Sequence, residues 1–294
     1  MPRSMDQSSV IGRRSLLQLA GVGLIGGPRL TGESRAQPTA AQVTLLSAPL
    51  ELAGNWGGSP PGDAAAVISR MRQVSLMGVR LVSDQQPERL RVEEHTSGPP
   101  AIWLHEDLPK TAWVIVDIGA LDWCKLAYQF GHELGHVLSN SWGPLAKPAA
   151  PSQWLEEALV EAFSIRGLAL LADSWEQHPP FPGDAGFAKS IRQYRADLIE
   201  KYRAAAPPGP DVAACFRTHC RDFTQGKGDP MVLAVVGEME RDPLCVEDLG
   251  GLNRWPARSA VPVAEYLPLW EKSCAELGAS VHLPAWLRTT LEPG

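Results

Sequence analysis

Positive charge is scarce in this sequence, and no basic run is long enough to form a stripe that binds nucleic-acid phosphates. The 27 Lys and Arg residues are outnumbered by 33 Asp and Glu, so the formal net charge is −6. We therefore expect no nucleic-acid partner. The 294 residues are 44% hydrophobic and include 26 Pro and 27 Gly. That composition is typical of folded elements joined by stiff loops, not of a disordered chain.

The sequence also lacks an apolar run long enough to cross a bilayer. The N-terminal run, at about residues 15–27, follows Arg13 and Arg14 and precedes a small-x-small cleavage site at 34–36. These three features predict a secretory signal peptide over residues 1–36. The arginine pair resembles a twin-arginine export signal, and an ordinary secretory signal with a chance pair is the alternative.

Cysteine is absent before Cys124, so no lipid-anchored cysteine can follow the signal. Removal of residues 1–36 takes away five Arg and two acidic residues, which moves the net charge from −6 to −9. We expect an acidic periplasmic or secreted bacterial protein without a stable membrane anchor. Its export partner would be the twin-arginine machinery.

An exported protein can form disulfides, and five cysteines leave at least one thiol unpaired within the chain. Spacing along the chain suggests Cys215–Cys220 and Cys245–Cys274 as bridges, with Cys124 free.

Hydrophobic patterning predicts an α+β fold. Strand-like runs are expected within residues 42–50, 78–83, 88–95, 101–108 and 111–121, and a helix capped by Asp63 is expected to run to Met77. These elements predict a small twisted mixed sheet with one helix packed on it.

Helices dominate the rest of the chain. Asp122 is expected to cap a helix that ends near residues 139–140, and Ser152 is expected to cap the next one. Further helices are expected over 186–205, 230–240 and 263–277.

The stretch QFGHELGHVLSNSW, residues 129–142, carries the strongest chemical signal. His132 and His136 are four residues apart, so a helix places both imidazoles on one face with Glu133 beside them. This spacing suits one zinc ion held by two histidines, with the glutamate near a metal-bound water. The alternative is a solvated helix face with a chance match. A buried His-Glu-His face without metal would be costly to desolvate, and we therefore predict one Zn²⁺ per chain.

A catalytic zinc takes three protein ligands and keeps one position for water. The segment WLEEALVEAF, at 154–163, offers Glu157 and Glu161, which are four apart and share a helix face. Glu156 is rotated by about 100° from Glu157 and is expected to contribute little. Glu157 follows His136 by 21 residues, across a Pro-rich loop that lets the second helix fold back.

HELGH followed by WLEEALVEAF resembles the gluzincin branch of zinc metallopeptidases. The resemblance covers about residues 43–170 and implies a zincin-like fold with a backing helix, an active-site helix and a glutamate helix. We expect a catalytic core over 37–171 and a mainly helical part over 172–294. The metzincin branch fits poorly, because Ser139 and Trp142 replace its glycine and third histidine.

The resemblance implies a role for each site residue. His132, His136 and Glu157 would be the zinc ligands, and Glu133 would be the general base. Glu161 would orient a ligand histidine.

The resemblance also implies an oxyanion donor and a substrate-binding strand. Gluzincins usually supply a Tyr or His to the oxyanion after the third ligand, and the candidates are Tyr194, Tyr202, His178 and His219. The strand around residues 113–120 would be the edge strand that pairs with an extended substrate.

The function implied is hydrolysis of a peptide or protein substrate by a zinc-activated water. One alternative is a non-catalytic zinc-binding envelope protein, which the lack of a matching oxyanion tyrosine favours and the intact Glu133 disfavours. Another is a zinc hydrolase of a non-peptide cell-envelope substrate.

Overall fold

The computed structural model describes residues 43–95, 98–147, 149, 151–205 and 229–291. The predicted signal peptide with Arg13 and Arg14, the candidate His219 and the predicted Cys215–Cys220 bridge lie outside these residues. The described residues belong to one compact unit, 42–294. None of their helices has the length and apolar character needed to span a bilayer.

Four short strands form a mixed sheet in the order β1-β2-β4-β3. They are β1 (Leu50–Ala53), β2 (Arg89–Glu94), β3 (Ala101–Ile102) and β4 (Thr111–Val116). β1, β2 and β4 run parallel, while β3 runs antiparallel to β4. In β2, Leu90 and Val92 are fully buried and alternate with the more exposed Arg91 and Glu93. The prediction of a small mixed sheet in an α+β fold is confirmed.

Three strand predictions were wrong. Residues 44–48 form turns before β1, and 78–83 are irregular. The latter segment instead connects distant parts of the chain, because Arg80 pairs with Glu247 and Ser83 donates to Asn140 Oδ1 at 2.5 Å. The strand around 113–120 is not at an edge of the sheet: β4 lies between β2 and β3, and the edge strands are β1 and β3.

The described helices are α1 (Pro61–Leu76), α2 (Trp123–Leu138), α3 (Gln153–Gln177), α4 (Ala188–Ala205), α6 (Asp229–Arg241), α7 (Val263–Leu277) and α8 (His282–Leu291). Short 3-10 helices are η1 (Trp56–Gly58), η2 (Ala185–Phe187) and η3 (Pro243–Gly251). Asp63 lies inside α1, which begins two residues earlier at a proline suited to the first helical turn. The expected helix over 263–277 matches α7, whereas α8 and η3 were not predicted.

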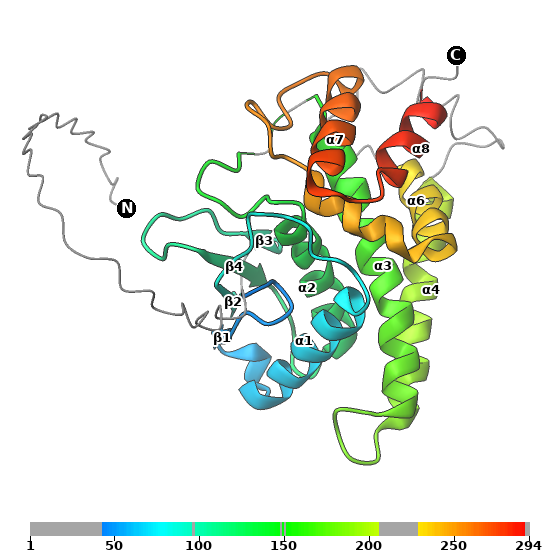
Figure 1. Ribbon diagram of the computed structural model, residues 1–294. Helices are drawn as coiled ribbons and strands as arrows, with labels where there is room; N and C mark the ends of the chain where they lie inside the picture. Colours follow the sequence, from blue (N-terminus) through cyan, green and yellow to red (C-terminus); the bar gives the residue numbers. More distant parts are fainter. Residues whose placement is uncertain (1–42, 96–97, 148, 150, 206–228, 292–294) are drawn as a thin grey trace, which may run out of the picture. The chain divides into compact units, whose positions relative to one another are not determined.

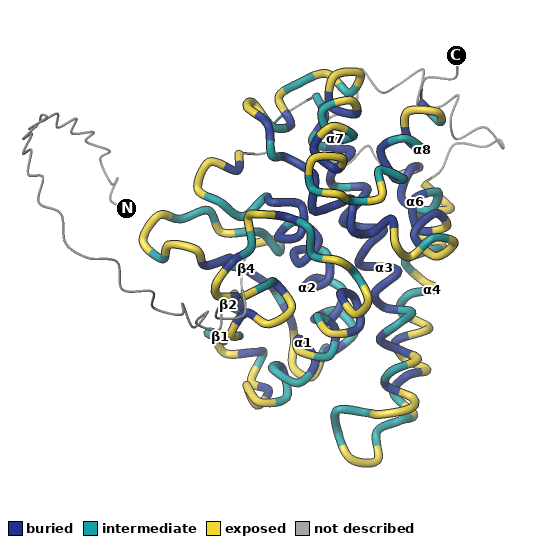
Figure 2. Tube along the Cα trace, in the orientation of Figure 1, coloured by how far each residue is buried: buried dark blue, intermediate teal, exposed yellow. Residues whose placement is uncertain are grey.

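Helix α3 is buried on most sides and contacts α1, α2, α4 and α6 (Figures 1 and 2). One continuous apolar core runs from the sheet through α3 to the C-terminal helices. The expected boundary at 171/172 falls within α3, so a single helix belongs to both predicted parts.

The predicted Cys245–Cys274 bridge is wrong, because both side chains are buried free thiols. Cys274 Sγ lies 3.4 Å from the carbonyl oxygen of Asp248, to which it donates a hydrogen bond. Cys124 is also a free thiol, as predicted.

Candidate metal centre

Helix α2 presents both histidines of the HExxH motif on the side that faces α3. The opposite side of α2 anchors the helix, because Leu126, Phe130 and Leu134 are fully buried in the core. His132 and His136 keep partly exposed rings, with centroids 5.0 Å apart. The local cause is the helical repeat, which puts residues four apart on one face.

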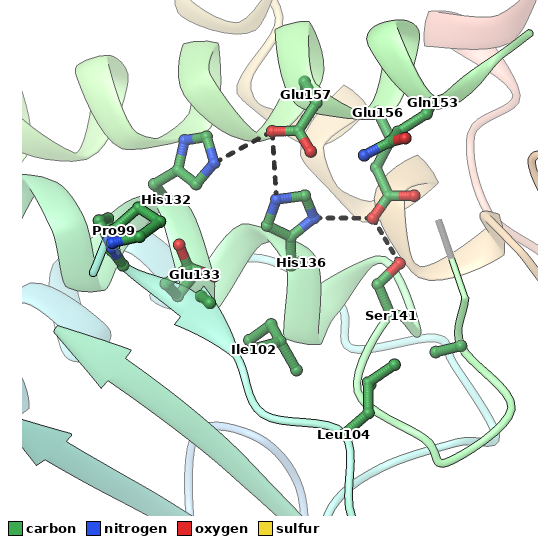
Figure 3. Close-up of a pocket in the computed structure, with 13 residues that line it drawn as sticks. Pro99, Ile102, Leu104, His132, Glu133, His136, Ser141, Gln153, Glu156 and Glu157 are labelled. Atoms are coloured by element: carbon green, nitrogen blue, oxygen red, sulfur yellow. Dashed lines mark hydrogen bonds and ion pairs between the residues drawn. The ribbon is translucent and has the colours of Figure 1, made fainter. Parts of the chain in front are cut away.

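Helix α3 brings Glu157 between the two histidines. Its Oε2 lies 3.4 Å from His132 Nε2 and 3.5 Å from His136 Nε2 (Figure 3). One donor atom from each of the three residues falls within 4.8 Å of the others. This group could hold a metal ion.

The Nδ1 atom of each histidine, which faces away from Glu157, contacts a different carboxylate. Glu161 Oε2 is 2.8 Å from His132 Nδ1, and Glu156 Oε1 is 2.8 Å from His136 Nδ1. A proton held at each Nδ1 leaves the Nε2 lone pairs directed at the space beside Glu157, which is the tautomer that metal binding needs. Glu156 lies outside the group that could hold a metal, as its rotation from Glu157 predicts, but its carboxylate reaches the second histidine, a contact that the sequence did not predict.

Each orienting carboxylate has further donors. Tyr128 and Tyr202 donate hydroxyl hydrogen bonds to Glu161 Oε1, at 2.8 and 2.6 Å. Ser141 donates to Glu156 Oε1, and Asn253 Nδ2 donates to Glu156 Oε2 at 2.7 Å. Sequence reasoning missed Tyr128, Ser141 and Asn253, since no spacing rule links them to the motif.

Burial and mutual charge set the protonation of the site. Burial lowers the pKa of His132, but its contacts with Glu157 and Glu161 outweigh burial and raise that pKa to about 9. The pKa of His136 is likewise raised, because hydrogen bonds to Glu156 and Glu157 outweigh burial. Burial would raise the pKa of Glu157, but the two histidines hold it well below its usual range.

Glu133 has the opposite shift. Burial raises the pKa of its carboxyl, the histidines partly offset this, and the nearby charges of Glu157 and Glu156 raise it further. A carboxyl group with a raised pKa is better matched to proton transfer near neutral pH.

A pocket of about 270 Å³ opens onto these residues. Pro99, Ala101, Ile102 and Leu104, on and around the edge strand β3, form an apolar wall. The opposite wall carries the motif residues with Ser141, Gln153 and Glu156 (Figure 3). An apolar wall with a few converging polar groups is typical of a small-molecule or peptide site.

The predicted oxyanion donors within the described residues do not line this pocket. The hydroxyl of Tyr202 is committed to Glu161, and the ring of Tyr194 packs against Tyr128 with centroids 5.9 Å apart. His178 follows the end of α3, nearly five turns of helix beyond Glu161.

Comparison of the chain with protein-family models, with curated proteins and with solved structures finds no match.

Proposed function

We propose that this protein is a zinc-dependent metallopeptidase of the gluzincin type with a zincin-like core. The observation that carries the proposal is the convergence of His132 Nε2, His136 Nε2 and Glu157 Oε2 beside the buried Glu133. Two imidazole nitrogens and one carboxylate oxygen form a donor set that suits zinc and leaves a position open.

Zinc held by His132, His136 and Glu157 would polarise a carbonyl group and would lower the pKa of water toward neutrality. The protein's own residues supply the proton transfers. Glu133 accepts a proton from the attacking water and then donates it to the leaving amine nitrogen. Its raised pKa supports both steps.

The edge strand supports an extended peptide as substrate. β3 pairs with β4 on one side, and no described strand covers its other side. An extended chain can add to such an edge through main-chain hydrogen bonds. Ile102 and Leu104 would contact substrate side chains beside the metal position.

A non-catalytic zinc-binding role is the second candidate. It is favoured because, among the described residues, the pocket is lined by no Tyr and by no His other than the two proposed ligands, His132 and His136. Zinc hydrolysis of a non-peptide cell-envelope substrate uses the same metal and base, and a panel of peptide and cell-wall substrates separates it from peptide hydrolysis.

The test of catalysis is Glu133→Gln, which keeps the shape and removes the proton acceptor. We expect wild-type protein to bind about one zinc and cleave a peptide library, and the variant to keep its zinc and lose cleavage. If Glu133→Gln loses metal as fully as His132→Ala, Glu133 is not the base. Wild-type protein with full zinc and no turnover on any substrate supports the non-catalytic role.

We also propose that the chain is exported to the periplasm or beyond by a twin-arginine signal. Changing Arg13 and Arg14 together to lysine should leave the uncleaved precursor in the cytoplasm, because the receptor of that pathway reads the guanidinium pair. Normal export of this double variant would indicate the ordinary secretory route.

A further inference from the structure

Asn253 reaches the metal centre from the C-terminal half of the chain. It follows η3, where the main chain turns toward α7, and only 4% of its surface is exposed. Its backbone has φ of 58°, a left-handed conformation that asparagine tolerates better than most residues. The residue is therefore placed by its own turn, 97 positions away from the glutamate that it contacts.

The amide nitrogen of Asn253 faces three acceptors. Nδ2 lies 2.7 Å from Glu156 Oε2, 3.0 Å from the Ser139 carbonyl oxygen and 3.2 Å from Ser141 Oγ. A carboxylate and a carbonyl can only accept, so the NH₂ group must point toward them. Tyr266 fixes the other end of the amide by donating its hydroxyl to Oδ1 at 3.2 Å.

The same contacts restrict Glu156. Ser141 Oγ accepts a hydrogen bond from Arg258 Nη2 at 2.6 Å, which directs the serine's own proton to Glu156 Oε1. With Asn253 on Oε2, both carboxylate oxygens are fixed, and Oε1 meets His136 Nδ1 at 2.8 Å.

We propose that Asn253 is a positioning residue for the metal centre. Through Glu156 it sets the orientation of His136, and the C-terminal half thereby helps to determine metal affinity. The inference rests on the proposed zinc site and concerns a residue that touches neither metal nor substrate.

Asn140 offers a matched control in the same region. It is also buried and left-handed, with φ of 63°. Its Nδ2 donates to the carbonyl oxygens of Gly250 and Leu252, at 3.0 and 2.8 Å. It therefore ties the end of α2 to the same segment as Asn253 does, but has no contact with Glu156.

The experiment compares Asn253→Asp with Asn140→Asp in the full mature chain. Each change keeps the size and the left-handed backbone and replaces a donor with an acceptor. Chelator competition measures zinc affinity. The visible absorption of the cobalt-substituted protein reports the geometry of the site, and thermal unfolding of the metal-free protein measures stability. We expect Asn253→Asp to weaken zinc binding about 10–100-fold and to alter the cobalt spectrum.

The control, Asn140→Asp, should lower the unfolding temperature about as much as Asn253→Asp does. It should change zinc affinity by less than about threefold. Tyr266→Phe, a milder change, should weaken zinc binding less than Asn253→Asp does. It keeps the test available if the aspartate variant fails to fold.

A double variant that exchanges the donor and the acceptor of the Asn253–Glu156 hydrogen bond should restore zinc affinity. In Asn253→Asp combined with Glu156→Gln, the glutamine amide can donate to the new carboxylate while its oxygen still accepts from His136. We expect this double variant to recover most of the lost affinity. Equal losses of affinity at Asn140 and Asn253, unchanged zinc binding in Asn253→Asp, or failure of the rescue would overturn the inference. Those results leave the proposed function standing, whereas wild-type protein that binds no zinc refutes both.

Discussion

Four glutamates surround two histidines at the candidate metal centre, and their roles differ by position. Glu157 faces both Nε2 atoms, Glu156 and Glu161 each hold one Nδ1 atom, and Glu133 is nearly buried beside them. In the metal-free protein the histidines outweigh burial and lower the pKa of Glu156, Glu157 and Glu161, whereas burial raises the pKa of Glu133. A divalent ion would take over this stabilisation of the ionised carboxylates.

The first prediction separates these roles by truncation. Glu157→Ala should lose zinc almost completely, because it removes a ligand. Glu161→Ala and Glu156→Ala should each weaken zinc binding about 10–100-fold, because each frees the Nδ1 side of one histidine. Chelator competition on the three purified variants measures the order.

Glu238→Ala is the control for loss of a buried carboxylate. Glu238 is 2% exposed and pairs with His282 and Arg241, in a cluster separate from the metal centre. This variant should unfold more easily and keep wild-type zinc affinity. If Glu161→Ala empties the site while Glu157→Ala keeps its metal, the assignment of the ligand is reversed.

At the scale of elements, two glycines let α2 lie close to its neighbours. A Cβ on Gly135 would come within 2.8 Å of Val160 Cβ and 3.1 Å of its Cα, both on α3. A Cβ on Gly131 would meet the side chains of Met71 and Ser164. Because α2 carries the histidines and α3 the glutamates, the spacing between these helices determines whether the donor atoms converge.

The second prediction tests this spacing with Gly135→Ala. The added methyl group meets a β-branched side chain and backbone, which cannot move away without shifting α3. We expect a loss of about 1–3 kcal/mol in the free energy of unfolding, together with weaker zinc binding. Denaturant unfolding and chelator competition provide the two measurements.

Gly237→Ala is the matched control, because nothing lies within 4 Å of the added Cβ on α6. It should stabilise the protein by about 0.5–1 kcal/mol, as alanine does in a helix interior, and leave the metal unaffected. Equal behaviour of the two variants would refute the close-packing account.

The elements that the sequence predicts best have a strong local pattern. Helix α7 has the predicted bounds, and β2 shows the predicted alternation. The segment 78–83 is as apolar as a strand, but its polar groups bond to residues far along the chain. The local pattern of apolar residues cannot distinguish a strand from an irregular segment of this kind.

The same division holds within the site. Helical spacing placed His132 and His136 on one face, and the resemblance to gluzincins implied Glu157, on the second helix, as their partner. The contact of Glu156 with His136 was not predicted. The position of Glu156 around the axis of α3 does not show which side chain of α2 lies opposite it. Asn253 could not be predicted at all, since only the folded chain brings it to Glu156.

On the scale of the whole molecule, the site depends on both halves of the chain. α4 supplies Tyr202 to Glu161, and the segment after η3 supplies Asn253 to Glu156. The core is continuous across α3. Stability of the whole molecule and occupancy of the site should therefore be linked.

The last prediction uses pH to expose that link. Contacts with Glu157 and Glu161 raise the pKa of His132 from its ordinary value of 6.5 to about 9 in the metal-free folded protein. A pKa raised by folding contributes stability that is full below the unfolded value and lost as pH rises through the folded value. Metal-free protein should therefore lose roughly 1–3 kcal/mol of unfolding free energy between pH 6.5 and 9.

The zinc-loaded protein should not follow this trend, because ligand histidines bind metal in their neutral form. Its zinc affinity should instead rise across the same interval, as fewer protons compete for the histidines. The lowered pKa of Glu157 acts only at acidic pH and leaves this window unchanged. Thermal unfolding of metal-free and zinc-loaded protein at pH 6.5, 7.5 and 9 measures the difference. A metal-free protein whose unfolding temperature is constant over this range would show that the histidines are not held protonated by Glu157 and Glu161.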